Sequence, residues 1–204
     1  MTAAQTRDRL LAAAADVFAR DGYAGTRVAE IARAAQVSNG AMYAHFGSKA
    51  ELLAAALRAH GPRLLAQTFS DHPERPVTDM LLRSGRKLRH RSGSRGNLVV
   101  EALAASRRDK DLAAAMRQYI GERAQVITER VTKAQADGEL DPSCAPDAIA
   151  HFLLLLGLGS ALLTPDLHEV GEDDWAGLLT TMISAITSPD FPSPREKEPQ
   201  EEES

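Results

Sequence analysis

Apolar residues recur at intervals of three and four along almost the whole chain, which is the spacing of one face of a helix. Leu10, Leu11, Ala14, Val17 and Phe18 form such a face near the start. No stretch alternates between apolar and polar residues for long, as a half-buried strand would. The sequence therefore predicts an all-α fold of about nine helices.

Residues near the end of the first helix predict that the helix stops there and the chain turns sharply. Gly22 can end the helix by adopting the left-handed conformation that other residues resist. Tyr23 then returns to the apolar face of that helix. Thr26 has the side chain of an N-cap and is expected to begin a second, short helix.

Two further capping signals predict a third and a fourth helix. Ser38 is expected to cap a helix over 39–46, which has a buried side and an exposed side. Ser48 and Glu51 have the spacing of a capping box at the start of the next helix. Two short helices separated by a tight turn are the layout of a helix-turn-helix, whose second helix enters the major groove of DNA.

The residues from Leu10 to Leu53 resemble the tetracycline-repressor (TetR) family of bacterial regulators. The matching residues are Gly22, Tyr23, Thr26, Ile31, Ala32, Val37, Ser38, Gly40, Tyr43, Phe46, Ser48, Lys49, Leu52 and Leu53. This resemblance implies a three-helix DNA-binding domain over 1–53, with its reading motif at 27–46. It implies a larger helical domain for effector binding and dimerisation over 54–188. Residues 189–204 are rich in Pro, Glu and Ser and are expected to form a disordered acidic tail.

The resemblance also implies a set of DNA contacts. Lys49 and the backbone N–H groups that begin the fourth helix would meet phosphate, as would Thr26. Tyr43 and His45 would pack against the sugar-phosphate backbone, and Arg27 would reach a base edge or a phosphate. The alternatives are a core aromatic for Tyr43 and a solvated charge for Lys49. The predicted DNA-binding residues are Thr26, Arg27, Ser38, Asn39, Gly40, Ala41, Tyr43, Ala44, His45 and Lys49.

Two departures from the family pattern affect this interface. Gln36 stands in the turn where the family commonly has Gly, which costs roughly 1 kcal/mol if that position needs a positive φ. Gly40, Ala41 and Ala44 offer no side-chain hydrogen bond to bases. Arg27 and Asn39 are therefore expected to carry the polar specificity, supported by thymine-methyl contact, phosphate positioning and DNA shape.

The last two predicted helices have more apolar surface than packing against a single neighbouring helix would cover. The helix opened by Pro146 is apolar nearly all round, so it needs partners on two sides. The resemblance supplies one of them in a second subunit, giving a two-fold symmetric dimer, and the alternative is a monomer with a large core. The predicted interface residues are Leu154, Leu155, Gly157, Leu158, Ala161, Leu162, Trp175, Leu179, Met182 and Ile183.

Arg123 and Arg130 fall on the apolar stripe of a long helix over about 109–136. A buried guanidinium needs a partner, and the alternatives are Glu101 or another core carboxylate, or an anionic ligand. The predicted pocket residues are Phe69, Met80, Met116, Tyr119, Arg123 and Phe152, although Met and aromatic stripes are also typical of plain core.

Charge is distributed unevenly along the chain. The net charge of −4 arises from 7 basic and 5 acidic residues in 1–60, 15 and 8 in 61–135, and 2 and 15 in 136–204. A basic front suits a protein that presents one face to DNA, although charges scattered on solvated helices give the same balance. The cluster Arg86, Lys87, Arg89, Arg91 and Arg95 is a further candidate for attraction to DNA, or a solvated loop.

The remaining sequence features bound the class of protein. Cys144 is the single cysteine, no Cys/His cluster has zinc-ligand spacing, and the start does not read as a signal peptide, so we expect a cytoplasmic location. The apolar run 148–163 is shorter than the ~20 residues of a membrane span. No nucleophile-base pair or phosphate-binding Gly loop is present, so neither an enzyme nor a cofactor is expected.

These features together predict a homodimeric transcriptional regulator of palindromic double-stranded DNA. It is expected to be a repressor released by an unidentified small-molecule effector. The alternatives are a helical small-molecule-binding or catalytic protein whose helix-turn-helix is only structural, and a regulator that answers to a protein partner.

Overall fold

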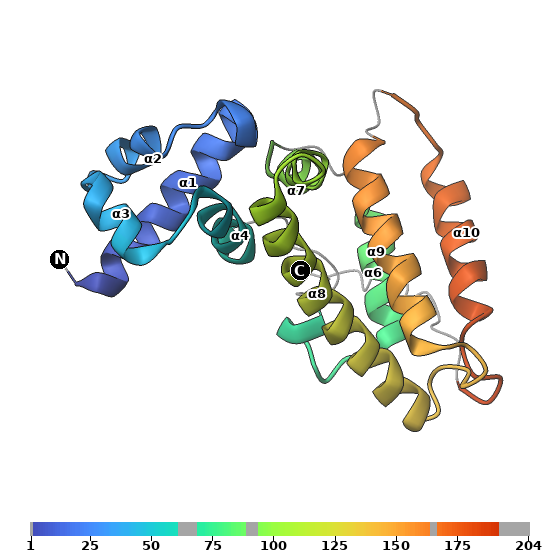
Figure 1. Ribbon diagram of the computed structural model, residues 1–204. Coiled ribbons are helices and arrows are strands. Elements are labelled where there is room, and N and C mark those ends of the chain that lie inside the picture. The colour runs from blue at the N-terminus through green and yellow to red at the C-terminus, as the bar shows by residue number, and fades with distance from the viewer. Residues whose placement is uncertain (1, 61–68, 89–93, 164–166, 192–204) are drawn as a thin grey trace, which may run out of the picture.

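The computed structural model describes residues 2–60, 69–88, 94–163 and 167–191. Throughout these ranges the regular structure is helical, apart from one isolated bridge between Leu140 and Thr187, which confirms the predicted all-α class. The helices, labelled as in Figure 1, are α1 (Ala3–Gly25), α2 (Val28–Ala34), α3 (Asn39–His45), α4 (Lys49–His60), α6 (Val77–Leu88), α7 (Ser94–Ser106), α8 (Lys110–Ala136), α9 (Pro146–Leu162) and α10 (Glu172–Ser184).

Helices α1 to α4 gather at one end of the molecule, which we call the head (residues 2–60). Helices α6, α9 and α10 lie at the opposite end, and α8 runs between the two (Figure 1). The long α8 packs against α4 and α7 on the side of the head and against α9 and α6 farther along. One helix therefore connects the two ends of the molecule.

Capping residues determine where most of the helices of the head begin and end. Gly22 has φ 68° within α1, as its predicted left-handed role requires, and the helix continues to Gly25 beyond this kink. Ser38 Oγ accepts a hydrogen bond from the N–H of Ala41, which confirms the predicted N-cap of α3. The prediction for Thr26 was wrong, because the N-cap of α2 is Arg27 and the Thr26 hydroxyl donates to the carbonyl of Gly22 at 2.6 Å.

The capping box at the start of α4 is only half formed. The N–H of Glu51 donates to Ser48 Oγ at 3.1 Å, as predicted. The carboxylate of Glu51 accepts its hydrogen bond from the N–H of Gly47 at 2.8 Å instead of from Ser48. The reciprocal contact is therefore shifted by one residue toward the turn.

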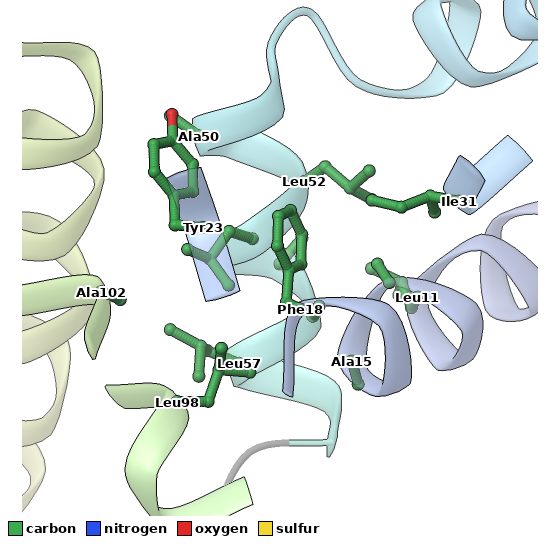
Figure 2. Close-up of a cluster of buried hydrophobic side chains, with 14 of the residues drawn as sticks. Leu11, Ala15, Phe18, Tyr23, Ile31, Ala50, Leu52, Leu57, Leu98 and Ala102 are labelled. Carbon is green, nitrogen blue, oxygen red and sulfur yellow. The ribbon is translucent and has the colours of Figure 1, made fainter. Parts of the chain in front are cut away.

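A first cluster of buried apolar side chains joins the head to α7 and the first half of α8. Figure 2 shows Phe18 and Tyr23 of α1 within this cluster, and Leu57 of α4 facing Leu98 of α7. The cluster continues through Met116 and Tyr119 of α8. The predicted boundary at residue 53 therefore crosses a continuous core.

A second cluster is built from α6, α8, α9 and α10 at the far end. It contains Phe69, Met80, Ile127, Val131 and Ile183, all nearly inaccessible to solvent.

Two polar contacts fix α6 within the far end. The carboxylate of Glu139, which is buried, accepts hydrogen bonds from the N–H and the hydroxyl of Thr78 at 2.7 and 2.8 Å. The indole of Trp175 donates to the carbonyl of Gly85 at 2.9 Å. Gly85 lies so close to Leu179 that an added Cβ would approach it to 2.9 Å, so α10 rests directly on the α6 backbone.

The C-terminal segment is described only in part. Residues 189–191 form a turn, in which the N–H of Phe191 donates to the carbonyl of Ser188 at 3.0 Å. Residues 192–204, which hold most of the predicted disordered tail, lie outside the described residues.

Candidate nucleic-acid interface

Helix α3 is held by one buried side and presents the other side to solvent. Met42 and Phe46 are almost completely buried in the first cluster. Asn39, Gly40, Tyr43 and Ala44 are exposed, and the Tyr43 side chain is 55% accessible. Ala41 and His45 are half-buried at the edges of this exposed face. The predicted division between an inner and an outer side of α3 is therefore confirmed.

The turn before α3 carries the strain that the sequence predicted. Gln36 has φ 55° and is the single residue other than glycine with a positive φ within the described ranges. This conformation costs a β-carbon-bearing residue roughly 1–2 kcal/mol. The side chain of Gln36 accepts a hydrogen bond from Arg9 at 2.8 Å, and the N–H of Val37 donates to the carbonyl of Ala32 at 2.9 Å. These contacts hold the turn and compensate part of the strain.

The two polar readers expected from the sequence are both accessible. Arg27 is exposed at the N-terminus of α2, where its backbone N–H donates to the carboxylate of Glu30 at 3.3 Å. Asn39 is exposed at the first position of α3. Thr26 is buried, so its predicted phosphate contact is not supported by its position.

Lys49 occupies a position that the sequence did not predict. Its Nζ donates to the carbonyls of Tyr23 and Thr26 at 2.7 and 3.1 Å and lies 4.3 Å above the Tyr23 ring. Burial lowers the pKa of Lys49, while the negative charge of Asp109 opposes that change. The ammonium group therefore ties the start of α4 to the end of α1, and its contact with phosphate stays a prediction.

Tyr23 extends this connection from the head to α8. Its ring stacks on Phe18, with the centroids 6.1 Å apart, and its hydroxyl donates to Oδ2 of Asp109 at 2.9 Å. Asp109 is the N-cap of α8 and accepts a second hydrogen bond from the N–H of Leu112 at 2.9 Å. The hydrogen bonds from Leu112 and Tyr23 lower the pKa of Asp109, and burial together with Asp109 raises that of Tyr23.

A cation that was not predicted from the sequence lies beside α3. The guanidinium of Arg7 is 5.2 Å from the centre of the Phe46 ring, so Arg7 of α1 sits next to the end of α3. Arg7 is exposed and has the charge that phosphate attracts. Its position three residues before Leu10, on the edge of the apolar stripe, was the available sequence signal.

The predicted basic cluster is described only in part. Arg86 and Lys87 are exposed in the last turn of α6. Arg89 and Arg91 lie outside the described residues, and the side chain of Arg95 is not described. The attraction of this cluster to DNA stays a prediction.

The six residues predicted to line a ligand pocket are not brought together. Phe69 and Met80 belong to the second buried cluster, whereas Met116 and Tyr119 belong to the first. Phe152 is 46% exposed on the surface of α9, so its assignment to a pocket wall was wrong. Arg123 lies with Tyr119, its guanidinium 3.6 Å from the ring centre.

Arg123 and Arg130 are both half-buried, and the carboxylate partner that was one alternative for them is absent from the described residues. Arg123 donates to the carbonyl of Tyr119 at 3.4 Å, and Arg130 donates to the carbonyl of Arg75 at 2.7 Å. Neither guanidinium has a described carboxylate within 4.0 Å. Glu101 instead lies against Gly22, where a Cβ would collide with its carboxylate.

The predicted dimer residues divide into two groups. Leu155, Leu162 and Met182 are exposed, by 56%, 61% and 39%, whereas Leu179 and Ile183 point into the chain's own core. The half-buried members are Leu154, Gly157, Leu158, Ala161 and Trp175. The assignment of Leu179 and Ile183 to the dimer interface was thus wrong, since α6 covers that side of α10. Phe152, Leu163 and Leu178 add to the exposed apolar surface of α9 and α10.

Among the helices that the structure describes, none combines the length and the apolar character needed to cross a membrane.

A short exposed helix, presented by a tight turn on a head that is joined to a larger helical unit, defines a helix-turn-helix DNA-binding protein. The model of the N-terminal domain of "Bacterial regulatory proteins, tetR family" matches residues 10–56. The model "Tetracyclin repressor-like, C-terminal domain" matches residues 77–182. The chain belongs to the TetR family and is a transcriptional regulator.

Individual relatives extend this similarity along the chain. HTH-type transcriptional regulator UidR of Escherichia coli (strain K12) is 28% identical over 183 residues, which cover 89% of this chain and 92% of UidR. HTH-type transcriptional regulator CymR of Pseudomonas putida is 49% identical over 53 residues, or 26% of each chain. The structure of Salmonella enterica GusR superposes with a TM-score of 0.73 at 25% identity, covering 88% of this chain and 94% of GusR. Regulators of this family bind DNA and form dimers.

Proposed function

We propose that this regulator is a homodimeric repressor that binds a palindromic operator and leaves it when a small molecule binds to the helical unit beyond the head. The observation that carries the proposal is the outward face of α3, which Met42 and Phe46 fix from below while Asn39 and Tyr43 remain accessible. A rigid support of this kind holds a reading helix in one orientation.

Direct reading of bases falls to Arg27 and Asn39. Among the other exposed positions of α3, Gly40 and Ala44 contribute shape and methyl contact but no side-chain hydrogen bond. Arg7, beside Phe46, supplies a cation for phosphate at the end of α3. Lys49 holds the segment that leads to Arg27, because its ammonium group donates to the carbonyls of Tyr23 and Thr26.

Operator binding is tested with DNA selected from a random pool by the wild-type protein. Fluorescence anisotropy then compares the selected site with a scrambled one over a range of salt concentrations. Arg27→Ala and Asn39→Ala are each expected to reduce discrimination by about 1–3 kcal/mol, because each removes a base-edge hydrogen bond. Arg117→Ala is the matched control, since Arg117 is exposed on α8 and outside the head. Unchanged discrimination in both head variants would contradict this assignment.

Dimerisation uses the exposed apolar surface of α9 and α10. Leu155 and Leu162 lie seven residues apart on α9 and share one face of that helix. Large exposed apolar side chains of this kind mark an interaction surface. Two heads arranged by a two-fold axis would match two half-sites of a palindrome.

The oligomeric state is measured by sedimentation velocity. Leu155→Glu and Leu162→Glu are each expected to shift the protein from dimer toward monomer, because a buried carboxylate without a partner is strongly unfavourable. Ala114→Glu, at an exposed position of α8, is the control and should remain dimeric. A dimer of unchanged stability in both leucine variants would place the interface elsewhere.

A further inference from the structure

The side chain of Tyr119 ends in a hydroxyl group without a hydrogen-bond partner in the part of the chain that the structure describes. The residue is fully buried in the first cluster, and within the described residues its hydroxyl has no partner with hydrogen-bond geometry. The polar side chain that interacts with it is Arg123. Buried hydroxyl groups in native proteins are almost always hydrogen-bonded, so an exception requires an explanation. A ligand that accepts from this hydroxyl is one such explanation.

Arg123 lies directly beside that hydroxyl-bearing ring. Its guanidinium is stacked at 3.6 Å from the ring centre and makes one long hydrogen bond, to the Tyr119 carbonyl at 3.4 Å. An arginine offers five N–H donors, so most of them remain available. Burial lowers the pKa of Arg123, the charges of Tyr119 and Glu122 raise it, and the positive charge of Arg58 lowers it. An added negative charge would further stabilise this partly buried cation.

The neighbouring acidic group, Glu122, supplies only part of that charge, because it is shared with Arg58. Glu122 is held by Arg58 of α4, whose Nε and Nη2 donate to its carboxylate at 2.7 and 2.9 Å. Gln118 donates to the same carboxylate at 3.0 Å. Glu122 is therefore committed to the contact between α4 and α8, and the group beside Tyr119 carries an excess of positive charge.

We propose that Tyr119 and Arg123 bind the carboxylate of a small organic acid, which is the effector of this regulator. The Tyr119 hydroxyl donates one hydrogen bond, and the planar guanidinium, oriented by the ring beneath it, donates the others. One available cation suits a monoanion better than a doubly charged phosphate. The surrounding cluster, which includes Met116 and has the half-buried Leu158 packed against it, favours an apolar body for the acid. This inference rests on the proposed release by a small molecule.

The position of the site explains how binding of an acid would affect the head. Arg58 lies in the last turn of α4, the helix that follows the reading motif, and Glu122 precedes Arg123 on α8. A carboxylate bound at Arg123 would place a second negative charge near Glu122 and would compete with it for Arg58. The acid therefore acts on the contact that fixes α4 against α8.

The test uses three acids, each paired with its uncharged amide: benzoate, phenylacetate and hexanoate. Thermal unfolding and isothermal titration calorimetry are carried out with the full chain. At least one acid is expected to raise the melting temperature while its amide does not. Arg123→Gln and Tyr119→Phe are each expected to weaken binding of that acid at least about tenfold, because each loses a hydrogen bond to a charged group.

The controls separate this inference from the proposed function. Arg117→Gln, an exposed arginine on the same helix, should bind the acid as the wild type does. Tyr119→Phe removes only a hydroxyl without a hydrogen-bond partner among the described residues, so its fold is expected to persist even where Arg123→Gln does not fold. Equal shifts from acid and amide, no shift from any of the three acids, or undiminished binding by Tyr119→Phe would overturn the site. Operator binding is measured without any acid, so its loss would count against the proposed function alone.

Discussion

The hydroxyl of Tyr23 donates a hydrogen bond to the carboxylate of Asp109 at 2.9 Å, across 86 positions of sequence. Tyr23 lies at the end of α1 in the head, and Asp109 caps the first turn of α8. Tyr23 also contacts Lys49 in two ways. The Lys49 ammonium group lies over the Tyr23 ring and donates a hydrogen bond to the Tyr23 carbonyl. This single residue therefore connects the start of α4, the end of α1 and the start of α8.

Tyr23→Phe removes only the hydroxyl of this connection and keeps the stacked ring. We expect the free energy of unfolding to fall by about 1–2 kcal/mol, because the lost hydrogen bond has a charged acceptor. Urea denaturation followed by circular dichroism measures the change. Tyr43→Phe is the matched control, since Tyr43 is exposed and should change stability little. Equal effects from the two variants would show that the bond to Asp109 contributes nothing.

The same contact predicts a dependence of stability on pH. The hydrogen bonds from Leu112 and Tyr23 lower the pKa of Asp109 in the folded protein. The stabilisation is therefore fully present above the unfolded pKa of about 4 and is lost as the pH falls through the lower folded value. Asp109→Asn should reduce stability at neutral pH, and its difference from the wild type should shrink toward pH 2. Urea titrations at several pH values measure this, and a constant difference would contradict it.

Gly22 is expected to be intolerant of a side chain. Its φ of 68° with ψ of 171° lies in a region that is almost restricted to glycine, and a Cβ there would collide with Glu101. Gly22→Ala should destabilise the protein by about 1–3 kcal/mol. Gly25→Ala is the control, because a Cβ there would meet only Asp21 at an ordinary contact distance of 4.0 Å and the φ of Gly25 is not positive. The double variant with Glu101→Ala separates backbone strain from the collision, and full recovery in it would exclude strain.

At Gln36, in the turn before α3, we expect a substitution to stabilise the protein, in contrast to Gly22. Gln36→Gly should relieve the strain of φ 55° and stabilise the protein by up to about 1 kcal/mol, reduced by the loss of the hydrogen bond from Arg9. Thermal unfolding measures the effect. Arg9→Ala removes the same hydrogen bond and leaves the strain, so it should destabilise slightly. A destabilised Gln36→Gly variant would mean that the contact with Arg9 outweighs the strain.

Features that depend on neighbouring positions were predictable from the sequence. Ser38, Gly22 and Gln36 act through the backbone within a few residues, so their roles at a cap, a kink and a strained turn follow from residue type and position. The exposed and buried sides of α3 follow from helical periodicity in the same way.

The sequence did not predict which distant segment a given side chain contacts. Lys49 has a charge that suits phosphate, but its ammonium group binds carbonyls that only the folded head brings within reach. Leu179 lies on an apolar stripe that fits a subunit interface equally well, and the close approach of Gly85 decides that it is core. Periodicity shows that a side chain will be covered but does not show by which segment.

The hydrogen bonds of Glu139 affect how the far end of the molecule unfolds locally. Its carboxylate binds the start of α6, its N–H donates to the carbonyl of Ala134 at the end of α8, and its carbonyl accepts from Ser188 beyond α10. Three segments separated by long stretches of sequence thus share one residue. The amide protons of Thr78, Glu139 and Ser188 would then exchange with solvent in a single cooperative event, so this end of the protein opens as one unit and not helix by helix.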